Sequence, residues 1–106
     1  MDYLAKKELE EQIIQVIKTV YDPEIPVDIY ELGLIYNIHI TDDCDVHIEM
    51  TLTSPNCPAA ESMPAEIRQK IGGMEMVRSF DLDIVFDPPW DQSMMSEEAQ
   101  IELGMI

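Results

Sequence analysis

One cysteine of the sequence lies where a thiol could be reactive. Cys57 belongs to the stretch TSPNCP at residues 53–58, in which turn-forming residues separate a predicted strand from a predicted helix. At the amino-terminal end of a helix, aligned amide dipoles favour the thiolate, which is the nucleophilic and metal-binding form of cysteine. On this local sequence alone, a buried structural cysteine is the alternative.

Four carboxylates gather in the loop after the first predicted helix. Asp22 and Glu24 come first, and Asp28 and Glu31 follow. Carboxylate oxygens suit hard metal ions, and a carboxylate beside a reactive thiol could handle a proton. They would also raise the pKa of such a thiol, in opposition to the helix dipole. Simple solvation of the loop is the alternative.

The two histidines of the sequence lie in neighbouring predicted strands. If the turn between these strands is centred on Asp43, His39 lies opposite His47 on the polar face of the sheet. Two imidazoles there could capture a divalent transition metal, although the sequence shows no third ligand, and ordinary exposed strand residues are the alternative. A Cys-His nucleophilic pair is disfavoured, because the hairpin carries both histidines away from Cys57.

Apolar periodicity predicts the elements that position these residues. Leucine, isoleucine and valine recur at helical spacing over residues 5–20, whereas residues 34–40, 46–52 and 79–86 alternate as half-buried strands do. A second helix is expected after Cys57 and should end at Gly72-Gly73. Ser96 suits the N-cap of a final helix that ends at Gly104.

The predicted order is helix, strand, strand, helix, strand, helix. Because each strand is polar on one face, helices should cover only the other face. The sequence therefore predicts an α+β fold, a two-layer α/β sandwich in which a small three-stranded sheet carries helices on one face. A length of 106 residues without an internal repeat or linker predicts a single domain over residues 1–106.

The charge balance limits the partners. Six basic residues against 22 acidic ones give a net charge of −16 and leave no basic stripe, so nucleic acid and anionic membrane surfaces are excluded as partners. No signal peptide or membrane-spanning stretch is evident, which predicts a cytoplasmic protein. Cys44 lies in the predicted hairpin turn, about 20 Å from Cys57 along the intervening strand, so an intrachain disulfide is not expected.

Four short strings occur in order along the chain. They are Asp22-Pro23-Glu24-Ile25, the sequence DIYELGLI at residues 28–35, Thr51-Leu52-Thr53 followed by Cys57-Pro58, and Asp87-Pro88-Pro89-Trp90. In this combination, across roughly residues 8 to 104, the chain resembles the SufT/PaaD-like family of iron-sulfur cluster assembly domains. It lacks the P-loop motif and the cysteine-rich C-terminal segment of some members, which favours a stand-alone accessory factor.

The resemblance implies a non-enzymatic role in iron-sulfur protein maturation. The partners that it implies are cysteine desulfurase, scaffold and carrier proteins, and apo iron-sulfur clients. Carried over position by position, the implied site comprises Asp22, Glu24, Thr51, Thr53 and Cys57, with Cys57 as the metal ligand. Leu32 and Gly33 match structural positions of the family.

The number of thiols limits what the site could hold. A [2Fe-2S] cluster usually takes four thiolates, whereas this chain offers one credible ligand. We therefore expect transient binding of iron, sulfide or a labile iron-sulfur cluster at Cys57, shared with the second subunit of a homodimer, a client protein or small thiols. The alternative is an adaptor that binds no metal and recruits apo-clients. A cysteine-dependent enzyme is disfavoured, because no positioned base is visible.

Overall fold

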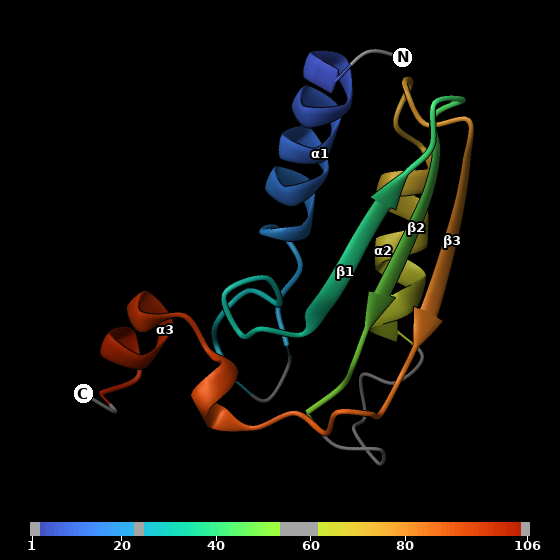
Figure 1. The fold of residues 1–106 in the computed structure, drawn as a ribbon. Coiled ribbons are helices and arrows are strands. Elements are labelled where there is room, and N and C mark those ends of the chain that lie inside the picture. Colours follow the sequence, from blue (N-terminus) through green and yellow to red (C-terminus); the bar gives the residue numbers. More distant parts are fainter. Residues whose placement is uncertain (1–2, 23–24, 54–61, 105–106) are drawn as a thin grey trace.

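The computed structural model describes residues 3–22, 25–53 and 62–104. Within them the helices and strands follow the predicted order, with one 3-10 helix in addition (Figure 1). The elements are α1 (Tyr3–Ile17), β1 (Ile35–Ile40), β2 (Asp45–Met50), α2 (Ser62–Gly72), β3 (Ser79–Ile84), the 3-10 helix η2 (Gln92–Met94) and α3 (Glu97–Glu102). No helix in these ranges is long and apolar enough to cross a membrane.

β2 is the central strand of a sheet with the order β1-β2-β3. β1 and β2 form an antiparallel hairpin in which His39 lies directly opposite His47, as the sequence predicted. β3 pairs with β2 in parallel and places Asp81 opposite His47. α2 provides the crossover that a parallel connection requires. The sheet is therefore mixed, which the strand patterns alone did not specify.

Helices cover one face of the sheet and leave the other face open (Figure 1). Along β2, Val46, Ile48 and Met50 are buried, whereas His47 and Glu49 between them are only half-buried. The two long helices contribute the buried residues Leu9, Ile13, Ile17, Ile67 and Ile71 to the same core. This arrangement confirms the predicted two-layer α+β sandwich with an open polar face.

The first helix ends at Ile17 and not at the predicted residue 20. The N–H of Val20 donates to the carbonyl oxygen of Ile17 at 3.0 Å, which closes a tighter turn. The carbonyl oxygen of Val20 then accepts a hydrogen bond of 2.9 Å from the N–H of Ile29. Val20 leaves the helix because it pairs with the loop that leads to β1.

The C-terminal part of the chain runs past the end of the sheet before it forms α3 (Figure 1). Ser96 caps α3, because its side-chain oxygen accepts a hydrogen bond of 3.1 Å from the N–H of Ala99. Gly104 follows the helix with a φ of +76°, so both predicted boundary residues are confirmed. The sequence did not predict η2, in which Asp91 accepts a hydrogen bond of 2.8 Å from the N–H of Ser93.

A hydrogen-bonded clasp joins the first residues of β2 and β3. The Arg78 guanidinium donates to both carboxylate oxygens of Asp45, with Nε 2.9 Å from Oδ1, and the Ser79 hydroxyl donates to Oδ1 at 2.6 Å. The bonds from Arg78, followed by the one from Ser79, lower the pKa of Asp45 to about 2. The clasp lies at the start of the parallel pairing of β2 with β3, whose register brings His47 and Asp81 together on the open face.

Candidate functional site

β2 leads directly into Thr51 and Thr53, two of the predicted site residues. The N–H of Thr51 donates to the carbonyl oxygen of Leu34 at 2.8 Å on one side of the strand. On the other side, the N–H of Val85 donates to the carbonyl oxygen of Met50 at 2.8 Å. The strand end is therefore held by both of its neighbours, in the segment that leads toward Cys57.

The Thr51 side chain is the most unusual feature of this strand end. It is fully buried, and its hydroxyl oxygen has no hydrogen-bond partner among the residues that the structure describes. A buried polar group in this state costs about 1–3 kcal/mol relative to a hydrogen-bonded one. Packing alone does not explain a threonine here, because valine would fill nearly the same volume without that cost. Thr53 is half-buried.

The loop between α1 and β1 carries Asp22, which is also buried. Its Oδ1 accepts a hydrogen bond of 3.2 Å from the N–H of Ile25. Backbone hydrogen bonds hold the loop together: the N–H of Ile29 donates to the carbonyl oxygen of Val20 at 2.9 Å, and the N–H of Leu34 donates to the carbonyl oxygen of Ile29 at 3.2 Å. Since the carbonyl oxygen of Leu34 also receives the bond from the end of β2, loop and strand end are directly linked.

Asp22 and Thr51 are the only buried polar or charged residues in the described part of the chain. The loop that carries Asp22 meets the end of β2, which leads into Thr51, at one end of the sheet (Figure 1). The structure thus brings two of the predicted site residues into one region. Glu24 and Cys57 fall outside the described residues, so their convergence on this region stays a prediction.

The other two carboxylates of the loop have structural partners. Asp28 Oδ2 accepts hydrogen bonds from the N–H groups of Tyr30 at 3.1 Å and Glu31 at 3.0 Å. Glu31 Oε1 lies 3.5 Å from the Lys18 ammonium. Both carboxylates therefore stabilise the loop, and Asp22 is the described carboxylate of this loop that stays a candidate for the site.

The string at residues 87–90 has a role that the sequence analysis missed. The indole Nε1 of Trp90 donates to the carbonyl oxygen of Leu32 at 2.8 Å, and the Tyr36 hydroxyl donates to the carbonyl oxygen of Pro88 at 2.8 Å. These bonds fasten the chain after β3 to the loop and to β1. The signal in the sequence was the single tryptophan beside two prolines, which indicates a fixed contact more than a simple strand end.

Two exposed aromatic side chains border this end of the sheet. Tyr21, next to Asp22, is 59% exposed, and Phe86, just beyond β3, is 48% exposed. The predicted strand over residues 79–86 includes Phe86, but β3 ends at Ile84 and the chain turns toward Pro88. Aromatic residues are enriched at protein interfaces, so their exposure here is compatible with a contact surface.

Comparison with known sequences gives consistent matches over most of the chain. A family model described as "Iron-sulfur cluster assembly protein" matches residues 10–80. A Porphyromonas gingivalis protein named Fe-S protein maturation auxiliary factor is 48% identical over 97 residues, which cover 92% of this chain and 92% of that protein. The Bacillus subtilis factor YitW, with the same descriptive name, is 39% identical over 92% of this chain and 95% of that protein.

Two further comparisons extend this result. The Staphylococcus aureus factor SufT, also named as an Fe-S protein maturation auxiliary factor, is 35% identical over 81% of this chain and 98% of that protein. A crystal structure of a Bacillus anthracis domain of unknown function, DUF59, has a TM-score of 0.89 and 29% identity, and covers 99% of this chain and 100% of that one. The fold described above is thus shared with a solved structure.

Proposed function

The chain belongs to the iron-sulfur cluster assembly protein family, and from this premise we propose that it is an auxiliary factor in the maturation of iron-sulfur proteins. Three relatives carry that function in their names. In this proposal the protein acts without enzymatic turnover in the cytoplasm, alongside cysteine desulfurase, scaffold and carrier proteins, and delivers to apo-clients. Cys57 is the residue that binds iron, sulfide or a labile cluster transiently.

The observation that carries the assignment of the site is the buried hydroxyl of Thr51. A polar atom without a partner at the end of β2 is compatible with a site that is completed by something other than the described residues. The buried carboxylate of Asp22 lies at the same end of the sheet. Cys57 follows this strand end in sequence, and Thr53 and Glu24 complete the proposed set.

The number of thiols in the chain favours a cluster that is shared with a partner over one that is held by a single chain. The chain has two cysteines, and Cys44 lies in the turn before β2, with a φ of +66°, whereas Cys57 follows the other end of that strand. One chain therefore does not offer the four thiolates that a cluster usually takes. A partner must supply further ligands, whether this is a second copy of the chain, a client or a small thiol. Such a cluster would be held weakly enough to be passed on.

An adaptor that binds no metal is the second candidate, and the exposed Tyr21 and Phe86 favour it. Both side chains border the same end of the sheet and offer apolar surface to a partner protein. Such an adaptor would recruit apo-clients to the assembly machinery independently of the thiol. Co-purification of apo-clients with the Cys57→Ala variant distinguishes the two, because only the adaptor keeps its full function without Cys57.

Anaerobic reconstitution with ferrous iron and sulfide tests the proposal. The chain offers a matched control, because Cys44→Ala removes the same group from the opposite end of β2. We expect the Cys57→Ala variant to lose iron and sulfide and the Cys44→Ala variant to retain them. Equal retention by the wild-type protein and the Cys57→Ala variant would exclude Cys57 as the metal ligand.

A further inference from the structure

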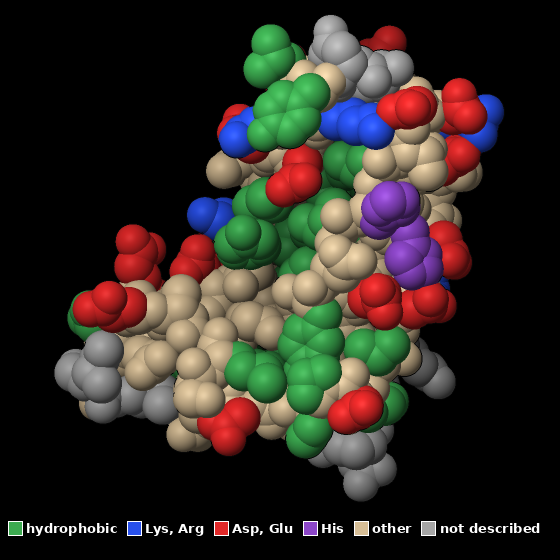
Figure 2. Space-filling model, in the orientation of Figure 1, with side chains coloured by type: hydrophobic (Ala, Val, Ile, Leu, Met, Phe, Trp, Pro, Cys, Tyr) green, Lys and Arg blue, Asp and Glu red, His purple; other side chains and the backbone are tan. Residues whose placement is uncertain are grey.

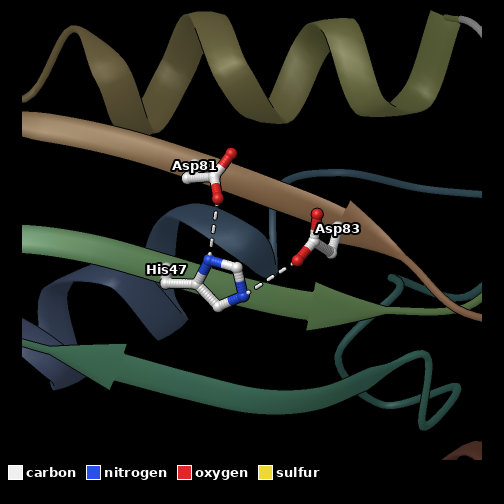
Figure 3. Close-up of side chains that lie close together, drawn as sticks. All are labelled: His47, Asp81 and Asp83. Atoms are coloured by element: carbon white, nitrogen blue, oxygen red, sulfur yellow. Dashed lines mark hydrogen bonds and ion pairs between the residues drawn. The ribbon is translucent and has the colours of Figure 1, made fainter.

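A second group of chemically active side chains lies on the open face of the sheet. His47 projects from β2, and Asp81 and Asp83 project from β3 toward it (Figure 3). The parallel register pairs His47 with Asp81. Because side chains alternate along a strand with a period of two, Asp83 lies on the same face as Asp81. Three potential metal ligands therefore meet on adjacent strands.

The imidazole of His47 lies between the two carboxylates. Its Nδ1 is 3.0 Å from Asp81 Oδ2, and its Nε2 is 3.2 Å from Asp83 Oδ2. One ligand atom from each residue can be chosen such that all three lie within 4.8 Å of one another. Two ligand atoms bound to the same first-row metal ion at roughly 2.1 Å lie about 3 Å apart, so the separation of Nε2 and Asp83 Oδ2 already suits a shared ion.

Two contacts of this kind need a positive charge at His47, which either a second ring proton or a metal ion supplies. A neutral imidazole carries one N–H group, so it can donate to only one of the two carboxylates. The other ring nitrogen then directs its lone pair at a negatively charged oxygen. A cation between that nitrogen and that carboxylate replaces repulsion by coordination. The remaining N–H keeps its hydrogen bond to the other carboxylate, as metal-bound histidines commonly do.

We propose that His47 Nε2 and Asp83 bind a divalent first-row transition-metal ion, and that Asp81 orients the imidazole through its Nδ1–H. Asp81 is thus a positioning residue and not a ligand. The side chains of Asp83 and His47 are 58% and 33% exposed, so water can fill the other coordination positions. Imidazole with carboxylate and water is a donor set of intermediate hardness, which suits Mn²⁺ or Fe²⁺.

The surroundings of the site favour a cation. Figure 2 shows the two histidines next to each other on this face, with acidic side chains around them. His39 lies opposite His47 on β1 and adds a second imidazole nearby. Asp45 is occupied by Arg78 and Ser79 and is not available as a ligand. The net charge of −16 attracts cations to the whole molecule, so the test must separate this site from general attraction.

Paramagnetic NMR with Mn²⁺ as the probe provides that test on the full chain. Mn²⁺ prefers oxygen and imidazole ligands to thiolates, so Cys57 does not compete for it. Its unpaired electrons broaden the signals of nearby amides, and excess Mg²⁺ in physiological salt occupies purely electrostatic positions. We expect substoichiometric Mn²⁺ to broaden the amides of residues 46–48 and 81–84 first. Broadening that begins elsewhere, or spreads evenly over the acidic surface, overturns the proposal.

Single substitutions separate the role of Asp83 as a ligand from that of Asp81 as a positioning residue. Asp83→Asn should weaken the response about tenfold or more, because it replaces a charged ligand by a neutral amide. Asp81→Ala should also weaken it about tenfold, whereas Asp81→Asn should restore it, since the asparagine carbonyl can accept the Nδ1–H bond. Glu8→Gln is the control: it removes one charge from the exposed surface of α1, away from the open face of the sheet, and should change little.

The results of these variants can contradict each part of the proposed metal site. An unchanged response of Asp83→Asn excludes Asp83 as a ligand, and an equal loss in Glu8→Gln shows general attraction only. Failure of Asp81→Asn to restore binding removes the positioning role of Asp81. The wild-type pattern needs no variant, so it decides on the site even if one variant does not fold. The site uses none of the residues proposed for maturation, and Cys57→Ala should leave the pattern unchanged.

Discussion

Gly33 lies against the backbone of Met94 so closely that a side chain at position 33 has no space. A β-carbon at Gly33 would lie 2.3 Å from the carbonyl oxygen of Met94, and Gly33 also has a φ of +80°. The loop that carries Asp22 and the C-terminal segment therefore meet at a contact that glycine alone permits. This contact keeps the segment after β3 in place beside the candidate site.

The Gly33→Ala variant should be strongly destabilised. The left-handed backbone conformation costs an alanine about 1–2 kcal/mol, and the clash with Met94 adds to that cost. Gly72→Ala is the control, because its β-carbon would meet nothing within 4 Å and Gly72 does not have a positive φ. Urea unfolding followed by circular dichroism measures both. A Gly33→Ala variant as stable as Gly72→Ala would contradict the contact.

Trp90→Phe should lower the free energy of unfolding by about 1 kcal/mol. The substitution keeps an aromatic ring but removes the hydrogen bond of 2.8 Å from the indole to the carbonyl oxygen of Leu32. Circular dichroism is the suitable readout, because Trp90 is the only tryptophan of the chain and the variant loses its fluorescence. An unchanged stability would mean that this bond does not hold the C-terminal segment.

Thr51→Val should stabilise the protein and impair its function. Removal of a buried hydroxyl that has no partner among the described residues should raise the free energy of unfolding by about 1 kcal/mol, while iron retention after reconstitution should fall. Thr41→Val is the control with the opposite sign, because the Thr41 hydroxyl accepts a hydrogen bond of 3.1 Å from the N–H of Asp45. Loss of stability in Thr51→Val would show that its hydroxyl is paired.

Asp91 should titrate below the ordinary range of an aspartate. Its carboxylate accepts hydrogen bonds from the backbone N–H and the hydroxyl of Ser93, which lower its pKa from the ordinary value of 3.8. The ionised form thus stabilises the folded state above that ordinary pKa, and the contribution is lost as the pH falls through the lower folded value. Carbon-detected NMR measures the midpoint. If the pKa of Asp91 were the same in the folded protein and in the chain unfolded in urea, the hydrogen bonds from Ser93 to Asp91 would be contradicted.

The hairpin could be predicted from the sequence because the residues that determine its pairing lie close together along the chain. Alternation over residues 34–40 and 46–52 and the polar turn between them are enough to place His39 opposite His47. The parallel pairing of β3 was not predictable in this way. It depends on the crossover through α2 and on the contact of Arg78 with Asp45, so Asp81 and Asp83 could not be recognised as neighbours of His47.

Burial of the candidate site residues was likewise not predictable from local sequence. The family resemblance singled out Asp22 and Thr51, but burial of both side chains depends on contacts between the loop, the strand end and the rest of the fold. A polar residue in a proline-containing loop is usually exposed, so local sequence gives no reason to expect a buried Asp22. The contacts of Trp90 and Gly33 were equally hidden from local sequence, because each lies against a residue far away in the sequence.

Iron and sulfide bound per chain, after anaerobic reconstitution and gel filtration, test the central claim most directly. If Cys57 is the working ligand, the wild-type protein and the Cys44→Ala variant retain both elements in similar amounts, and the Cys57→Ala variant loses them while it keeps its fold by circular dichroism. Equal retention by the Cys57→Ala variant and the wild-type protein would contradict the assignment of Cys57 and favour an adaptor that binds no metal.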